Sequence, residues 1–329
     1  MTDPLRADAG FQAYLMVRDH VREMQRHARA GSPDASAYWT EELEIIDYMI
    51  EASPLIVRKL RHHAFPITAI RPYDYRDKGD GRRQYFEARL AALRALAGDT
   101  LLVPEAPALG GFGYAIDGQL YNVDTLKFYE VLIGMERGGV LAALRAKDRP
   151  LVCEVGSGWA GFAYQFKTLF PRATYVLVDF PELFLFSATY LMTLFPGARV
   201  RFWGEEPADR IFANWRDYDF IFTPNTALTD LTPDRLDLAV NMVSFQEMTT
   251  AQVTSYVAKS HELGARFLYS LNREKSAMNS ELDSVTRIIS QYYWPRDVQI
   301  LKVSYQKMLD EPPSKSDYKH VIGWKRVRI

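Results

Sequence analysis

Residues 151–180 read LVCEVGSGWAGFAYQFKTLFPRATYVLVDF. An apolar run ends in Glu154, a turn with three glycines follows, and a second apolar run closes on Asp179. The segment between the turn and the second run has the length of a helix. This order predicts a β-loop-α-β unit with a carboxylate at the end of each strand, which is typical of sites for nucleoside-bearing cofactors.

Gly156, Gly158 and Gly161 of this turn form a G-x-G-x-x-G pattern. Glycines there permit a tight turn and close approach of the backbone to a ligand. The pattern alone is a weak signal, because glycines also let a strand and a helix pack closely. Asp179 follows Gly161 by 18 residues, where a carboxylate can accept both hydroxyl groups of a ribose. The combination favours a cofactor site.

Glu154 discriminates between two cofactors. A nicotinamide dinucleotide places its pyrophosphate at the helix N-terminus, where an acid two residues before the first glycine would repel it. S-adenosyl-L-methionine has no phosphate, and its methionine part carries an ammonium and a sulfonium group that suit this acid. The sequence therefore favours the methyl donor, with a nicotinamide oxidoreductase as the disfavoured alternative.

The chain changes character near residue 148, which predicts two domains, 1–148 and 149–329. The first is mainly helical, and its expected helices cover 41–52, 54–60, 84–97 and 126–145. Long connections are expected between the helices, over 62–83 and 103–125. We expect this part to form a lid or substrate domain.

Strands and helices alternate in the second part. The expected strands are 151–155, 174–179, 219–223, 236–242, 266–271, 298–305 and 320–327, with a further short one at 199–203. Long connections between the first five favour parallel pairing with right-handed crossovers. The last two are expected to form a hairpin at one edge of the sheet.

Composition sets the remaining bounds. The chain has 329 residues, with 40 Lys and Arg against 41 Asp and Glu. Cys153 is the single cysteine, no apolar run reaches the length of a membrane span, and the N-terminus lacks the layout of a signal peptide. We expect a cytoplasmic protein that acts on a small-molecule substrate and has no nucleic-acid or membrane partner. A homodimer is the oligomeric state to test.

The second part of the chain resembles the class I S-adenosylmethionine-dependent methyltransferases. The matching segments are EVGSG (154–158), YVLVDF ending around Asp179, and LDLAVNMVSFQEM (236–248). The segments GGFG (110–113), YNVDTLKFY (121–129), VDFPE (178–182) and SFQEM (244–248) also resemble bacterial sugar O-methyltransferases of natural-product pathways. The resemblance implies a Rossmann-like α/β fold, with a mainly parallel seven-stranded sheet and a terminal antiparallel hairpin.

The resemblance also implies roles for individual residues toward S-adenosyl-L-methionine, whose product is S-adenosyl-L-homocysteine. Asp179 would bind the ribose and Phe180 would lie against the adenine. Further cofactor residues are the methionine-side group Glu154, Gly156 and Gly158, and the later positions Thr223, Asn225 and Asn241. Ser244 and Gln246 would face the acceptor. The register at Thr223 is open, because 199–203 and 219–223 compete for the third strand.

Methyl transfer to a hydroxyl group calls for a base near the acceptor. Glu247 is the first candidate because it follows the fourth strand directly, although an acid there also suits a helix start. His63, next to His62, is the alternative base. No His, Asp or Glu group shows the spacing of metal ligands, so no metal is expected.

Aromatic residues are numerous, and Trp159, Tyr121 and Tyr129 are candidates for the walls of a substrate pocket. The expected reaction is O-methylation of a small molecule, a (deoxy)sugar or a glycosylated natural-product intermediate. Methylation of carbon or nitrogen in an aromatic or prenyl metabolite is the closest alternative. A non-catalytic methyltransferase-like module is a further one.

Overall fold

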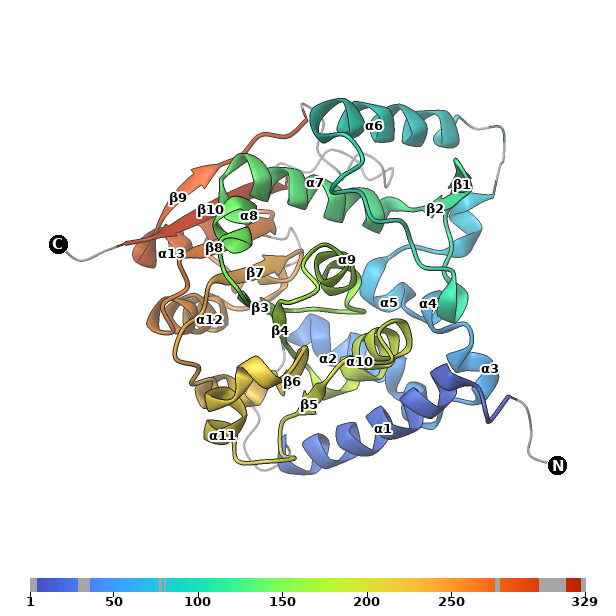
Figure 1. The fold of residues 1–329 in the computed structure, drawn as a ribbon, viewed down its shortest axis with the longest axis horizontal. Coiled ribbons are helices and arrows are strands. Elements are labelled where there is room, and N and C mark those ends of the chain that lie inside the picture. The colour runs from blue at the N-terminus through green and yellow to red at the C-terminus, as the bar shows by residue number, and fades with distance from the viewer. Residues whose placement is uncertain are drawn as a thin grey trace.

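Eight strands form the main sheet in the computed structural model, which describes residues 5–28, 36–76, 79, 81–275, 279–301 and 318–326. Their order is β5-β6-β4-β3-β7-β8-β10-β9. The six from β5 to β8 are parallel, and β10 is antiparallel to both of its neighbours (Figure 1). The strands are β3 (Leu151–Val155), β4 (Thr174–Asp179), β5 (Val200–Phe202), β6 (Phe220–Pro224), β7 (Leu238–Met242), β8 (Phe267–Asn272), β9 (Tyr293–Asp297) and β10 (Lys319–Lys325).

This arrangement is the Rossmann-like fold of class I methyltransferases, as the sequence predicts. The sheet has eight strands rather than seven, because the competing segments 199–203 and 219–223 both form strands. β6 pairs with β4, and β5 adds an edge strand beyond it. The register that the sequence leaves open is therefore settled, and Thr223 lies opposite Val178 near the carboxyl ends of β6 and β4.

The terminal hairpin is confirmed, but its first strand lies earlier than predicted. β9 begins at Tyr293, directly after helix α13 (Val285–Tyr292), and residues 298–301 are not a strand. The rest of the expected strand, 302–305, lies outside the described residues. The aromatic pair Tyr293 and Trp294 suits an extended backbone, and Tyr293 is fully buried while Trp294 stands opposite Trp324 on β10.

Apolar side chains alternate between the two faces of the parallel strands. Leu151, Cys153 and Val155 of β3 join one hydrophobic cluster, whereas Val152 joins the other. Strands that carry apolar side chains on both faces are expected where helices cover both faces of a sheet. One face packs against α7 (Val123–Arg137), α9 (Gly161–Leu169) and α10 (Phe184–Leu194), and the other against α11 (Ala208–Ala213), α12 (Thr250–Glu262) and α13.

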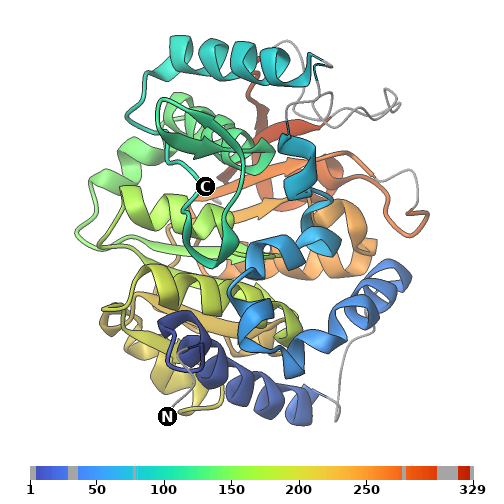
Figure 2. The same ribbon diagram turned by 90° about the vertical axis from the view of Figure 1, so that its right-hand side faces the viewer.

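The first 148 residues are mainly helical, as predicted. The elements are α1 (Ala9–Ala28), α2 (Ala37–Ile46), α3 (Pro54–Val57), α4 (Leu60–His63), α5 (Phe65–Thr68), α6 (Arg82–Ala97) and α8 (Val140–Arg145), with a small hairpin of β1 (Tyr114–Ile116) and β2 (Gln119–Tyr121). Helix α1 packs against α10 (Figure 2). The expected connection over 62–83 contains α5, because Pro66 suits the first turn of a helix.

The N-terminal helices share one hydrophobic cluster with the sheet. Tyr14 of α1 and Leu60 of α4 belong to the same buried group as Phe184 and Phe222. Whether the chain divides into two domains near residue 148 stays a prediction.

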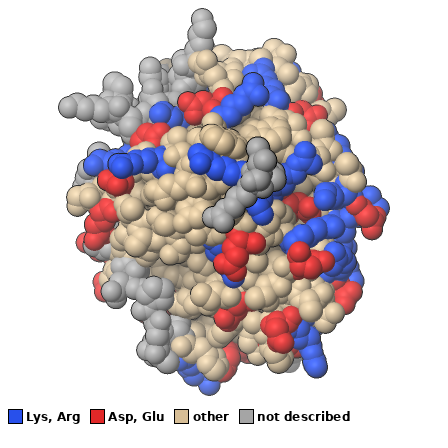
Figure 3. All heavy atoms as spheres, turned by 90° about the vertical axis from the view of Figure 1, so that its left-hand side faces the viewer, with Lys and Arg blue, Asp and Glu red and all other residues tan. Residues whose placement is uncertain are grey.

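Lys and Arg side chains intermingle with Asp and Glu on the face in Figure 3. No helix in the described part of the chain combines the length and apolar character that a membrane span needs.

Candidate active site

The glycine turn shapes the carboxyl edge of the sheet. Gly156 follows β3 with φ 72°, and a Cβ atom there would lie 2.2 Å from the Ser244 Oγ. Gly158 has φ 55°. Because these backbone conformations and this close approach exclude larger residues, glycine is required at the turn. The turn thereby lies directly against the loop after β7.

A cleft at this edge has two contiguous halves. Both are lined by Trp39, Gly156 and Ser244. The first half has a volume of about 420 Å³ and reaches Asp179, and the second has a volume of about 640 Å³ and reaches Glu154 and Glu247, in each case with space open to solvent included. Helix α2 contributes Trp39, and α5 and α7 contribute Ile67 and Phe128, so the first 148 residues supply part of the walls and the strand ends with their loops supply the rest.

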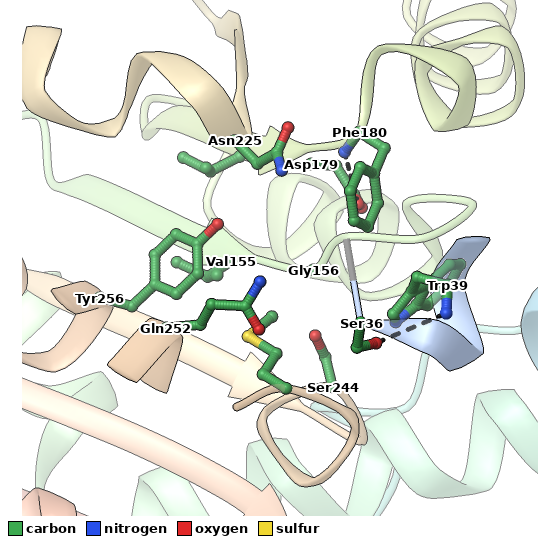
Figure 4. Close-up of a pocket in the computed structure, with 12 residues that line it drawn as sticks. Ser36, Trp39, Val155, Gly156, Asp179, Phe180, Asn225, Ser244, Gln252 and Tyr256 are labelled. Atoms are coloured by element: carbon green, nitrogen blue, oxygen red, sulfur yellow. Dashed lines mark hydrogen bonds between the residues drawn. The ribbon is translucent and has the colours of Figure 1, made fainter. Parts of the chain in front are cut away.

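Asp179 and aromatic side chains mark the first half. In Figure 4, Tyr256 and Gln252 of α12 lie across the pocket from Phe180 and Trp39. Asn225 lies beside Asp179, after the neighbouring strand β6. The Oδ1 atom of Asn225 is buried and has no hydrogen-bond partner among the described residues. This half therefore combines flat apolar walls, a carboxylate and an acceptor oxygen.

The Asp179 carboxyl group is tied to the glycine turn. Its Oδ2 accepts hydrogen bonds from the Gly158 N–H at 2.8 Å and the Ser157 hydroxyl at 3.2 Å, and its Oδ1 accepts one from the Phe180 N–H at 2.9 Å. Burial raises the pKa of Asp179 to about 7, although these donors act in the opposite direction. A ligand that donates to this carboxylate would favour its ionised form.

Glu154 forms the floor of the second half. Its side chain is buried, and its Oε2 accepts a hydrogen bond from the Tyr175 hydroxyl at 2.9 Å. Burial raises the pKa of Glu154 to about 8, and the Asp179 carboxyl adds to the rise while Lys127 counteracts it. A buried carboxyl group with one neutral donor is suited to receive a cationic group.

Glu247 faces the same half from the loop after β7. Burial raises its pKa to about 8, and Glu42 acts in the same direction. A hydrogen bond from the Trp39 side chain and the charges of Arg273 and Lys127 lower it. A carboxyl group whose pKa lies near neutrality is suited to accept a proton at the pH of the cell.

The backbone beside Glu247 is strained. Val243, which also lines the second half, has φ 55°. A β-branched residue rarely adopts this left-handed conformation, and such outliers cluster at functional sites. Ser244 follows with its N–H donating to the Asn272 Oδ1 at 3.1 Å, so the loop is held by a side chain at the end of β8.

The cleft brings together many residues that the sequence singles out. The predicted residues that line it are Glu154, Gly156, Gly158, Trp159, Asp179, Phe180, Asn225, Ser244 and Glu247. They come from four different strand ends and the loops after them. The carboxyl ends of parallel strands meet at one edge, which explains this convergence.

Three predicted residues lie beneath the cleft and do not line it. The Asn241 amide donates to the Val155 carbonyl at 2.8 Å, and its Oδ1 accepts from the Phe245 N–H and the Asn272 amide. Gln246 donates to the Tyr318 hydroxyl at 3.1 Å, and Thr223 is fully buried. The first two bind protein groups that fix the strand ends.

Three other predicted residues lie away from the two halves of the cleft. The Tyr129 hydroxyl donates to the Gly98 carbonyl, and Tyr121 stands near Arg94. His63 pairs through Nδ1 with the Tyr48 hydroxyl at 2.7 Å. Burial lowers the pKa of His63, so its imidazole is neutral at neutral pH, but it is not among the residues that line the cleft.

The sequence reasoning missed several lining residues. Trp39, Ile67, Lys127, Gln252 and Tyr256 all line the cleft. Trp39 and Ile67 belong to helices that pack over the sheet, and no local motif marks them. Lys127 lies inside segment 121–129, one of the segments that resemble sugar O-methyltransferases, and four residues after the start of α7. Its place in that segment is the signal by which the sequence could have identified it.

Comparison with known proteins gives structural likeness at low identity. No protein family model matches the chain, and no curated protein matches it. The bifunctional kinase-methyltransferase WbdD is 15% identical, with 65% of this chain and 42% of that chain covered and a TM-score of 0.43. The matched region thus spans less than half of the WbdD chain.

Two further solved structures show the same kind of likeness. Human N-acetylserotonin methyltransferase in complex with SAM is 10% identical, over 63% of this chain and 57% of that chain, with a TM-score of 0.33. The pyocyanin biosynthetic protein PhzM is 12% identical, over 59% and 57%, with a TM-score of 0.36. These values do not bear on activity or substrate, and the fold assignment rests on the strand order.

Proposed function

We propose that the chain is an S-adenosyl-L-methionine-dependent methyltransferase that acts on a hydroxyl group of a small molecule. The supporting observation is the pair of buried acids, Glu154 and Asp179, at the ends of adjacent strands on either side of the glycine turn. The residues fit the cofactor, because Asn225 offers a buried unpaired oxygen for a donor such as the adenine amino group. Glu154 would face the cationic methionine end.

The chain's own groups suggest how the reaction proceeds. When bound, S-adenosyl-L-methionine supplies a methyl group on a sulfonium sulfur, whose bonding electrons stay with sulfur as the acceptor oxygen forms its new bond to carbon. Glu247 would accept the proton of the acceptor hydroxyl group. Trp39 would hold the Glu247 carboxylate and close the cleft, which excludes water and aligns the acceptor for an in-line displacement.

The acceptor is proposed to be a (deoxy)sugar or a glycosylated natural-product intermediate. Trp39 and Phe128 offer ring faces in the second half of the cleft, and such faces stack on the C–H surfaces of a sugar.

Within the described residues, no group of three His, Cys, Asp or Glu side chains is arranged to hold a metal ion. The cytoplasmic location and the homodimer stay predictions from the sequence.

Transfer of a labelled methyl group tests this function. The purified protein is incubated with labelled S-adenosyl-L-methionine and a panel of glycosides, nucleotide-linked sugars and phenols. We expect label in an alkali-stable ether of at least one hydroxylated compound. Label on carbon or nitrogen alone would contradict O-methylation, and binding of the donor without transfer to any compound would support a non-catalytic module.

A further inference from the structure

We call the second half of the cleft the acceptor half, because Glu247 lines it. The acidic and basic side chains around it are unequal in number. The charged side chains that line this half are Lys127, Glu154 and Glu247. Two more charged residues, Glu42 and Arg273, act electrostatically on Glu247 without lining this half. No arginine or histidine is among the described residues that line it.

The charge of Lys127 is already matched. Its Nζ lies 2.8 Å from the Asp124 Oδ1, and Asp124 is buried with 1% of its side chain exposed. The other oxygen of Asp124 accepts a hydrogen bond from the Trp159 Nε1 at 3.0 Å. Because Asp124 already neutralises the ammonium group, a ligand anion would share Lys127 with a buried carboxylate. Arg61 lies 3.8 Å from the other Asp124 oxygen, so the local groups comprise four carboxyl groups against three cations.

Most of the remaining walls are apolar, with Thr68, Ser157 and Ser244 as the uncharged polar exceptions. Ile67, Phe128, Leu183 and Met242 line this half beside the two tryptophans, Trp39 and Trp159. A phosphate group placed here would leave water for a surface that offers it no free cation, which is costly in a partly buried site. An uncharged ring can use the same walls without that cost.

An anionic acceptor would also disable the base. Glu247 acts as a base only when it is ionised, and its half-buried carboxyl group lies beside Trp39. A second negative charge nearby disfavours ionisation of a carboxyl group. A phosphate on the acceptor would therefore raise the pKa of Glu247 further, so both binding and proton transfer select against it.

We propose that the acceptor is an uncharged glycoside, with its sugar already joined to an apolar aglycone, and not a sugar that carries a phosphate or nucleoside diphosphate. This inference rests on the proposed function. In reaction order, a glycosyl transfer that releases the nucleoside diphosphate must precede methylation. The apolar walls would contact the ring face and the aglycone, while Glu247 receives the hydroxyl proton.

Matched acceptors test the proposal. One sugar is supplied as a glycoside of an apolar alcohol, as its 1-phosphate and as its nucleoside diphosphate derivative. Binding is measured by calorimetry with S-adenosyl-L-homocysteine present, and transfer by kcat/KM with labelled donor. We expect the glycoside to exceed both anionic forms by about tenfold or more in each measurement. Equal or better use of an anionic form would overturn the proposal.

A charge placed on the wall gives a second test. Ile67→Lys adds a cation beside the acceptor half, and Ile67→Met is the matched neutral control. The ratio of kcat/KM for the phosphate to that for the glycoside should rise about tenfold in Ile67→Lys relative to Ile67→Met. An unchanged ratio would refute selection by charge. Lack of S-adenosyl-L-homocysteine binding in the wild-type chain would instead count against the proposed function.

Discussion

At the scale of single residues, Asp179 has two tasks. It accepts three hydrogen bonds from the glycine turn and from Phe180, and it lines the first half of the cleft. The geometry therefore adds a structural role to the ribose-binding role that the sequence implies. A substitution at this position should affect both the turn and the ligand.

Asp179→Ala is expected to weaken binding of S-adenosyl-L-homocysteine by about 1.5–3 kcal/mol, or roughly 10- to 100-fold, because the ribose loses a charged acceptor. Calorimetry well below the melting temperature measures this. Asp148→Ala removes an exposed carboxylate, 93% accessible, and serves as the control. Wild-type affinity in Asp179→Ala would refute the assignment.

Glu247→Gln should lower kcat by about 100-fold or more and leave the affinity for S-adenosyl-L-homocysteine nearly unchanged. In the wild-type chain, kcat should rise with pH up to about 8, because the raised pKa of Glu247 keeps the base protonated below that value. The glutamine variant should lose this rise. If it keeps wild-type turnover, the base lies elsewhere, and His63→Gln is the next variant to measure.

At the scale of elements, helix α2 links the N-terminal part of the chain to the proposed base. Ser36 caps the helix through its side chain, and Trp39 one turn later reaches both halves of the cleft. The ring of Trp39 lies 5.6 Å from that of Phe180, and its side chain donates to Glu247. One helix turn therefore contacts both the cofactor side and the proposed base.

Trp39→Phe keeps an aromatic ring and removes the donor, so the ionised form of Glu247 loses a hydrogen bond. The midpoint of the rise of kcat with pH should move upward by about 0.5–1 pH unit. Trp203→Phe is the matched control, because it removes an indole N–H that donates to Asp230 away from the cleft. A downward shift, or an equal shift in both variants, would contradict the role of Trp39.

The elements show what the sequence can and cannot predict. Apolar runs and the glycine turn predict β3 and β4 with their boundaries, because strand burial and turn chemistry are local signals. The position of β9 was missed, because residues 293–297 mix aromatic and charged side chains and their pairing with β10 is non-local. Trp39 was missed for a similar reason, since only the packing of α2 over the sheet places it in the cleft.

At the scale of the whole molecule, carboxyl groups with raised pKa values couple the cleft to stability. The pKa values of Glu154 and Glu247 are raised to about 8. The folded chain therefore holds protons near neutral pH that the unfolded chain has released. This contribution to stability is complete at low pH and is lost as the pH rises through about 8.

The free energy of unfolding should accordingly fall by about 3 kcal/mol between pH 7 and pH 9. Asp219 and Glu274, whose pKa values are lowered to about 2, stay ionised throughout this range and do not oppose the trend. Denaturant titrations at several pH values measure it. Glu154→Gln should reduce the slope by about half, and a wild-type stability that rises over this range would contradict the account.

The cofactor tests the central claim most directly. Calorimetric titration of the wild-type chain with S-adenosyl-L-homocysteine, and separately with NAD, compares the two nucleoside-bearing ligands that the glycine turn alone permits. We predict saturable one-to-one binding of S-adenosyl-L-homocysteine, tighter at pH 8 than at pH 6 because Glu154 and Asp179 must ionise, and no binding of NAD. Binding of NAD alone would contradict the account.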